Sequence, residues 1–133
     1  MPTPRSPDDW MAQATTDLRA AEHLLTGGFA RHAAVLAHLA AERAMKAVWQ
    51  ARHGGTPPVT HHLPVLREDV PGPVPALVEE ALDALARGGL PALYADTWTD
   101  GVPAAAARAR VSHAHDVFAW AAEQLHVSSA DRD

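Results

Sequence analysis

The stretch that decides the fold is residues 29–53, FARHAAVLAHLAAERAMKAVWQARH, a run that contains neither glycine nor proline. Its apolar residues recur every three or four positions, which is the period of an α-helix. Further apolar residues widen this stripe, and a helix that is apolar over so much of its circumference usually lies at the centre of its domain. The stripe comprises Phe29, Ala33, Leu36, Ala40, Ala44 and Val48, widened by Val35, Leu39 and Trp49.

Glycine pairs and prolines divide the chain on both sides of this helix. An earlier helix is predicted from Asp8, whose side chain could cap it, to the pair Gly27-Gly28. Its inward stripe is Trp10, Ala14, Leu18, Ala21 and Leu25.

Beyond the break at residues 54–58, we expect one helical turn over residues 63–69 and a third long helix over residues 76–87. A last helix is predicted to begin near Pro103, since proline suits a first helical turn. The expected inward residues are Leu77, Ala81, Leu82 and Leu85 on the third helix, and Val111, Phe118, Ala121 or Ala122, and Leu125 on the last.

The composition agrees with a single helical domain. Of 133 residues, 29 are alanine, the best helix former, whereas aromatic residues make up only 5%. The chain has no cysteine, which excludes a disulfide scaffold, a zinc ribbon and a thiol nucleophile. We expect a flexible N-terminus over residues 1–7, one domain over residues 8–126 and a disordered tail over residues 127–133.

The predicted fold is all-α, an up-and-down bundle of four to five helices. Alanine stripes allow helices to approach closely, but they bury little apolar area, so one small bundle of this kind would be only marginally stable. We therefore expect a homodimer in which the long second helix, the last helix, or both bury a face against a second copy.

The net charge of -5 gives the protein no general attraction for nucleic acid or for anionic membranes. No apolar run approaches the roughly 18 residues that a membrane span needs, and the N-terminus does not have the layout of a signal peptide. We expect a cytoplasmic protein whose contacts with nucleic acid, if it makes any, come from a local cleft.

Four polar residues share one face of the second helix: Arg31, His38, Glu42 and Lys46, the only lysine. One interpretation is a solvated stripe with an ordinary Glu–Lys pair one helical turn apart. The other is a polar seam along the bundle groove that holds a phosphate or orders a partner helix. Periodicity alone does not choose between them.

The last helix carries arginines followed by histidines at a spacing that matters for RNA cleavage without metal. An imidazole can move a proton from the 2′-OH while a guanidinium stabilises the charged phosphorane. On a continuous helix Arg108 and His115 would converge, and so would Arg31 and His38. His115 also falls on the predicted apolar stripe, so it could instead be a partly buried core histidine or an interface residue.

The other chemistry that the residues could support is limited. The nine histidines include no pair at the helical spacing that zinc favours, so we expect no metal site. The chain also has no glycine-rich phosphate loop and no Ser–His–Asp arrangement, and we expect no cofactor.

Several segments resemble the HEPN family, the higher eukaryotes and prokaryotes nucleotide-binding domain. Residues 40–47, AAERAMKA, are similar to the family's A-x-E-x-A-x-K-A core. Residues 60–63, THHL, resemble its T-H-D-L loop, and Tyr94 lies where a loop tyrosine is expected before the last helix. The sequence departs from the family pattern at Leu39, His62 and Trp98, where many members have Gln, Asp and Arg.

The resemblance implies a helical bundle, commonly a homodimer and often paired with a minimal nucleotidyltransferase in toxin–antitoxin systems. Some members are metal-independent RNases, but an intact nuclease motif is not the rule in the branch with the T-H-D-L loop. We therefore expect a protein that binds nucleotide, RNA or a partner, rather than an enzyme. The expected ligand-binding residues are Lys46, Glu42, His38, His61 and Tyr94.

Two alternatives stay open. The first is an RNase toxin that uses His115 with Arg108 or Arg110 as its catalytic residues. The second is a structural partner subunit that binds no ligand, in which the same stripes serve helix–helix contact.

Overall fold

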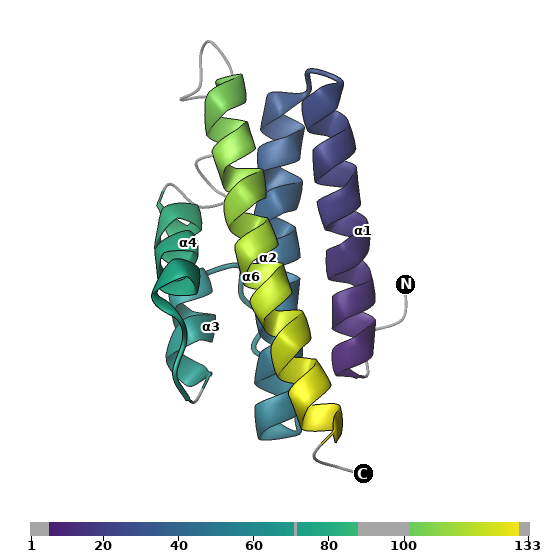
Figure 1. Ribbon diagram of the computed structural model, residues 1–133, viewed down its shortest axis with the longest axis vertical. Coiled ribbons are helices and arrows are strands. Elements are labelled where there is room, and N and C mark those ends of the chain that lie inside the picture. The colour runs from purple at the N-terminus through teal and green to yellow at the C-terminus, as the bar shows by residue number, and fades with distance from the viewer. Residues whose placement is uncertain (1–5, 71, 88–101, 131–133) are drawn as a thin grey trace.

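The computed structural model describes residues 6–70, 72–87 and 102–130. In this part of the chain all regular structure is helical, as predicted: α1 spans Pro7–Thr26, α2 Ala30–His53, α3 Leu63–Asp69, α4 Ala76–Ala86 and α6 Ala104–Ala130. Figure 1 shows α1, α2 and α6 side by side along the long axis, with α3 and α4 flanking them. The long helices α1, α2, α4 and α6 alternate in direction, which confirms the up-and-down bundle (Figure 1).

The central helix is α2, which packs against α1, α6 and α3. Most of its residues from Ala33 to Val48 are buried, because small alanine side chains let three neighbours approach it closely. The predicted central role of residues 29–53 is confirmed. Phe29 is the exception, since its side chain precedes the helix and is exposed.

Helix ends follow the local chemistry of the sequence. Ser6 caps α1, because its hydroxyl accepts from the Asp9 amide while the Asp9 carboxylate accepts from the Ser6 amide. The expectation that Asp8 is the cap is therefore wrong. Gly54 ends α2 with φ +78°, a left-handed conformation that glycine adopts without strain.

The inward faces of α4 and α6 differ in part from the prediction. On α4 the first buried residue is Val78 rather than Leu77, whose side chain is exposed. On α6, Phe118 and Leu125 are only partly buried, and Ala122 is exposed. Along α6, Ala107, Val111, Ala114, Val117 and Ala121 are buried at intervals of three or four positions, and Trp120 is buried beside them.

The last helix also continues to Ala130, so it includes residues 127–130 of the segment expected to be a disordered tail. Among the described helices, none is long and apolar enough to cross a membrane.

Candidate functional site

The middle of α2 holds three polar side chains that the fold buries. His38, Glu42 and Lys46 follow one another at intervals of four residues, so they line one face of the helix. Counted over the whole residue, backbone included, their exposed fractions are 1%, 2% and 6%. The interpretation of this face as a solvated stripe is therefore wrong, and these residues form part of a polar seam inside the bundle.

Glu42 is the centre of this seam. Its Oε2 atom accepts from Lys46 Nζ at 3.1 Å, and its Oε1 atom lies 2.7 Å from His61 Nδ1. Both carboxylate oxygens thus have a partner, as a buried carboxylate requires. His61 lies in the loop between α2 and α3, and 68% of its side chain is exposed, so it connects the buried pair to solvent.

The side chain of His38 holds the same loop by contacting the backbone of His61. Its Nε2 lies 2.9 Å from the carbonyl oxygen of His61, which can only accept, so Nε2 carries the proton. Burial lowers the pKa of the His38 imidazole, an effect that outweighs the opposing effect of the His61 carbonyl. His38 is therefore neutral near pH 7, with Nδ1 free to accept a hydrogen bond.

Arg110 of α6 supplies that hydrogen bond. Its Nη2 atom donates to His38 Nδ1 at 3.4 Å and to the carbonyl oxygen of Leu85, at the end of α4, at 2.8 Å. Burial lowers the pKa of the Arg110 guanidinium, which still carries its charge near neutral pH. We call His38, Glu42, Lys46, His61 and Arg110 the polar cluster.

Trp10 of α1 completes the surroundings of Lys46. The Lys46 Nζ atom lies 5.3 Å from the centre of the Trp10 ring, a cation–π geometry. Two buried donors at the cluster have no hydrogen-bond partner among the described residues, Trp10 Nε1 and Arg110 Nε. The sequence predicts Trp10 only as a core residue, since nothing in its spacing indicates that it would contact a lysine on another helix.

Of the two candidate catalytic pairs on α6, the structure separates Arg110 from His115. Arg110 points toward α2 and α4, whereas His115 Nε2 lies 2.5 Å from Glu22 Oε1 on α1. Half of the His115 side chain is exposed, so the prediction that it belongs to the apolar stripe is wrong. Arg108 is also exposed. Ala114 and Val111 occupy the buried side of α6 instead.

A family model for the HEPN domain matches residues 7–125. The chain belongs to the HEPN family. Every residue of the polar cluster lies within the matched HEPN region. No curated protein matches the chain.

Two solved structures resemble this HEPN domain over nearly all of its length. The crystal structure of TT1696 from Thermus thermophilus has a TM-score of 0.72 and 28% sequence identity, and the match covers 89% of this chain and 97% of that chain. The crystal structure of ST0689, an archaeal HEPN homologue, has a TM-score of 0.69 and 21% identity, with 91% and 98% covered. These likenesses show the HEPN fold.

The two segments that resemble the HEPN pattern, residues 40–47 and 60–63, both contribute side chains to the polar cluster. Residues 40–47 place Glu42 and Lys46 there, and residues 60–63 bring His61 to Glu42. Tyr94 and Trp98 lie outside the described residues. Among the residues that the structure does describe, no group of three or more acidic or histidine side chains is arranged to hold a metal ion.

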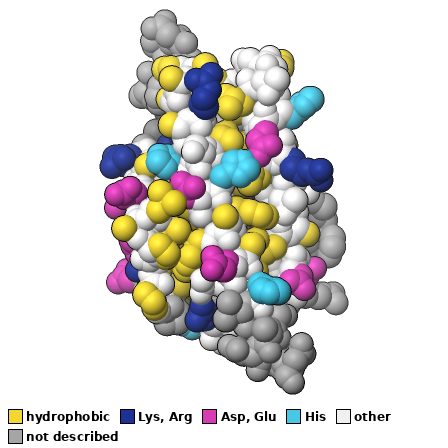
Figure 2. Space-filling view, viewed as in Figure 1, with side chains coloured by type: hydrophobic (Ala, Val, Ile, Leu, Met, Phe, Trp, Pro, Cys, Tyr) yellow, Lys and Arg dark blue, Asp and Glu magenta, His cyan; other side chains and the backbone are white. Residues whose placement is uncertain are grey.

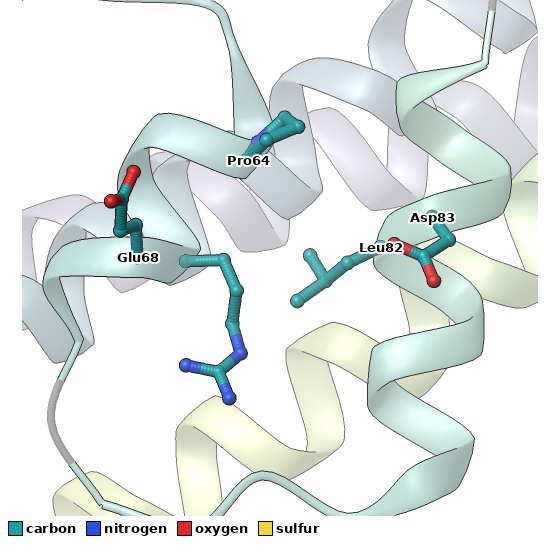
Figure 3. Close-up of a pocket in the computed structure, with 5 residues that line it drawn as sticks. Pro64, Glu68, Leu82 and Asp83 are labelled. Atoms are coloured by element: carbon teal, nitrogen blue, oxygen red, sulfur yellow. The ribbon is translucent and has the colours of Figure 1, made fainter.

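The HEPN domain also has a small hollow of about 220 Å³ between α3 and α4. Figure 3 shows Pro64 and Glu68 on α3 at one side of it and Leu82 and Asp83 on α4 at the other, with the Leu82 side chain pointing into the space between the helices. The nearby Arg67 is already paired with Glu79. At this size the hollow falls below the roughly 300 Å³ at which small-molecule sites begin.

Proposed function

We propose that this HEPN domain binds a phosphate-bearing ligand, a nucleotide or a short RNA, at the polar cluster. The observation that carries the proposal is the buried Glu42–Lys46 pair, joined through Glu42 to the exposed ring of His61. A buried ion pair contributes little net stability, because desolvation offsets its attraction. Its presence in a small alanine-rich bundle is better explained by a ligand than by stability.

The charge of the cluster suits an anion. Lys46 and Arg110 are positive, Glu42 is negative and His38 is neutral, so the cluster carries a net positive charge in a protein whose net charge is -5. Buried donors without a partner are rare in folded proteins and point to a missing acceptor. Trp10 Nε1 and Arg110 Nε are two such donors, and phosphate oxygens are acceptors.

Calorimetric titration with ATP and with short single-stranded RNAs tests the proposal. We expect saturable binding that His61→Ala weakens about tenfold, which corresponds to about 1.4 kcal/mol. His62→Ala is the matched control, because His62 is the exposed neighbour of His61 and lies outside the cluster. No binding at millimolar ligand, or equal losses in the two variants, would contradict the proposal.

A second candidate is a metal-independent RNase that uses Arg108 and His115. The specific observation in its favour is that both side chains are exposed and that His115 is paired with the Glu22 carboxylate, which can orient an imidazole for proton transfer. Induced expression should then arrest growth, His115→Ala should relieve the arrest, and His126→Ala, an exposed histidine further along α6, should not. Equal growth of all the strains would rule this candidate out.

We also propose that the domain forms a homodimer and pairs with a minimal nucleotidyltransferase in a toxin–antitoxin system. Support for a dimer comes from α6, where Ala105, Ala109, Ala119 and Ala122 are exposed in addition to its buried residues. Apolar side chains gather over the centre of the face on which α6 lies in front (Figures 1 and 2). Light scattering should give twice the mass of one chain, and a pull-down should recover the nucleotidyltransferase. Recovery of the enzyme with no ligand bound would favour the structural subunit.

A further inference from the structure

A second hollow lies at the end of the bundle where α2 and α6 terminate, and it shares no residue with the polar cluster. It has a volume of about 440 Å³ and is lined by Arg52, Pro73, Pro75, Trp120, Glu123 and Gln124, among others. Arg52 follows Lys46 by six residues, about 9 Å along the helix axis. The volume falls in the range of sites that take small molecules, roughly 300 to 1,000 Å³.

One wall of this hollow is apolar and rigid. Pro73 and Pro75 hold the segment before α4 in a fixed backbone conformation, because the proline ring restricts φ. Gly72 turns the chain into this segment with φ +96°, a value that other residues rarely adopt. Trp120 of α6 also lines the hollow, with 7% of the residue exposed. A wall of this kind is formed before a ligand arrives, which lowers the cost of binding.

The other side of the hollow carries charges of both signs. Arg52 is held in place by Gln124, whose Oε1 accepts from Arg52 Nη2 at 2.8 Å, and its guanidinium keeps further donors for a ligand. Glu123 is exposed and forms no ion pair within the described part of the chain. A cation and a carboxylate thus face the same apolar wall.

We propose that this hollow binds a free α-amino acid with a large apolar side chain. Arg52 receives the carboxylate in the two-pronged geometry that suits a guanidinium, Glu123 receives the ammonium group, and the side chain lies against Trp120 and the prolines. Glu123 would repel a ligand with several negative charges, and a hydrocarbon would interact with neither Arg52 nor Glu123. A zwitterion with an apolar body matches every part of the lining.

Ligand-observed NMR and calorimetry with L-phenylalanine test this proposal on the whole chain. We expect saturable binding that Arg52→Gln and Glu123→Gln each weaken at least about tenfold. Both residues are exposed, so the variants should fold normally, which circular dichroism checks. Arg19→Gln and Glu80→Gln are the matched controls, since these residues are exposed on other helices and should leave binding unchanged.

Two analogues separate a free amino acid from the end of a peptide. L-Phenylalaninamide lacks the carboxylate and N-acetyl-L-phenylalanine lacks the ammonium group, so each should bind far more weakly than the free amino acid. The proposal is overturned if neither L-phenylalanine nor any other standard amino acid binds at about 10 mM, if binding survives both charge variants, or if either analogue binds as tightly as L-phenylalanine. None of these results bears on the polar cluster, whose ligand assays use different residues.

Discussion

Replacement of Lys46 by methionine should destabilise the protein strongly, because it leaves a buried carboxylate with one partner. Lys46 Nζ lies 3.1 Å from Glu42 Oε2, and the two side chains are 8% and 3% exposed. At that distance the attraction is about 5 kcal/mol for an effective dielectric constant near 20. Breaking a buried pair on one side costs about 3 to 5 kcal/mol. Since His61 still contacts Glu42, we expect the lower end, about 3 kcal/mol.

The double variant Glu42→Leu/Lys46→Met should recover most of this loss. It removes both charges and replaces them with apolar side chains, an exchange that is often neutral or stabilising. Methionine can still pack against the ring of Trp10. The exposed side chain of His61 can rotate and form hydrogen bonds with solvent instead. We expect the double variant to lie within about 1 kcal/mol of the parent, and the coupling between the two sites to reach at least about 2 kcal/mol.

Urea unfolding followed by circular dichroism measures these free energies, provided that the slope against urea stays constant across the variants. The matched control is Arg67→Met, which breaks an ion pair with Glu79 in which both side chains are at least 30% exposed. That change should cost less than about 1 kcal/mol. A loss for Lys46→Met no larger than that for Arg67→Met, or losses of the two single variants that simply add in the double variant, would contradict this prediction.

Two further predictions concern the stability of the protein at low pH and the glycine that ends α2. Burial lowers the pKa of His38 in the folded protein, so as the pH falls the unfolded chain takes up a proton at His38 before the folded protein does. The free energy of unfolding should therefore fall as the pH drops below about 6.5. The contribution of His38 is at most about 1.4 kcal/mol per pH unit. His38→Gln, which can still donate and accept at the same place, should make urea unfolding less sensitive to pH between 7 and 5; an unchanged pH dependence would show that His38 is not responsible. Gly54→Ala should lower stability by about 1 kcal/mol because Gly54 has φ +78°, whereas Gly55→Ala, at a position without such a φ, should cost much less in the same thermal unfolding measurement. Equal losses at the two glycines would contradict the account of how α2 ends.

Most of the fold could be predicted from the sequence, because glycine and proline interrupt the helices at clear positions. Residues 29–53 and the turn at residues 63–69 match α2 and α3 closely. The inward face of α6 was harder to predict, since alanine occurs on all sides of that helix and several stripes fit its period. The predicted stripe contains Val111, His115 and Phe118, and only packing against α1 and α2 shows that the buried face keeps Val111 but runs through Ala114 and Val117.

The candidate site was predictable only in part. Periodicity places His38, Glu42 and Lys46 on one face, but whether that face is buried depends on the helices around it. The contact between His38 and Arg110 joins residues 72 positions apart, and no local pattern encodes it. The sequence predicts Arg110 as a possible catalytic partner of His115 because the arginine precedes the histidine at a spacing found in metal-independent RNases, yet its guanidinium reaches across to α2.

The central claim is that the polar cluster is a ligand site, and the most direct test observes His61 itself. In protein labelled with ¹⁵N at histidine, titration with ATP should move the ring resonances of His61, whose Nδ1 lies 2.7 Å from Glu42, and leave those of His62 in place. The shifts should saturate with the same affinity that calorimetry gives. If the His61 resonances stay still at millimolar ATP and with short RNAs, or move no more than those of His62, the polar cluster is not the binding site.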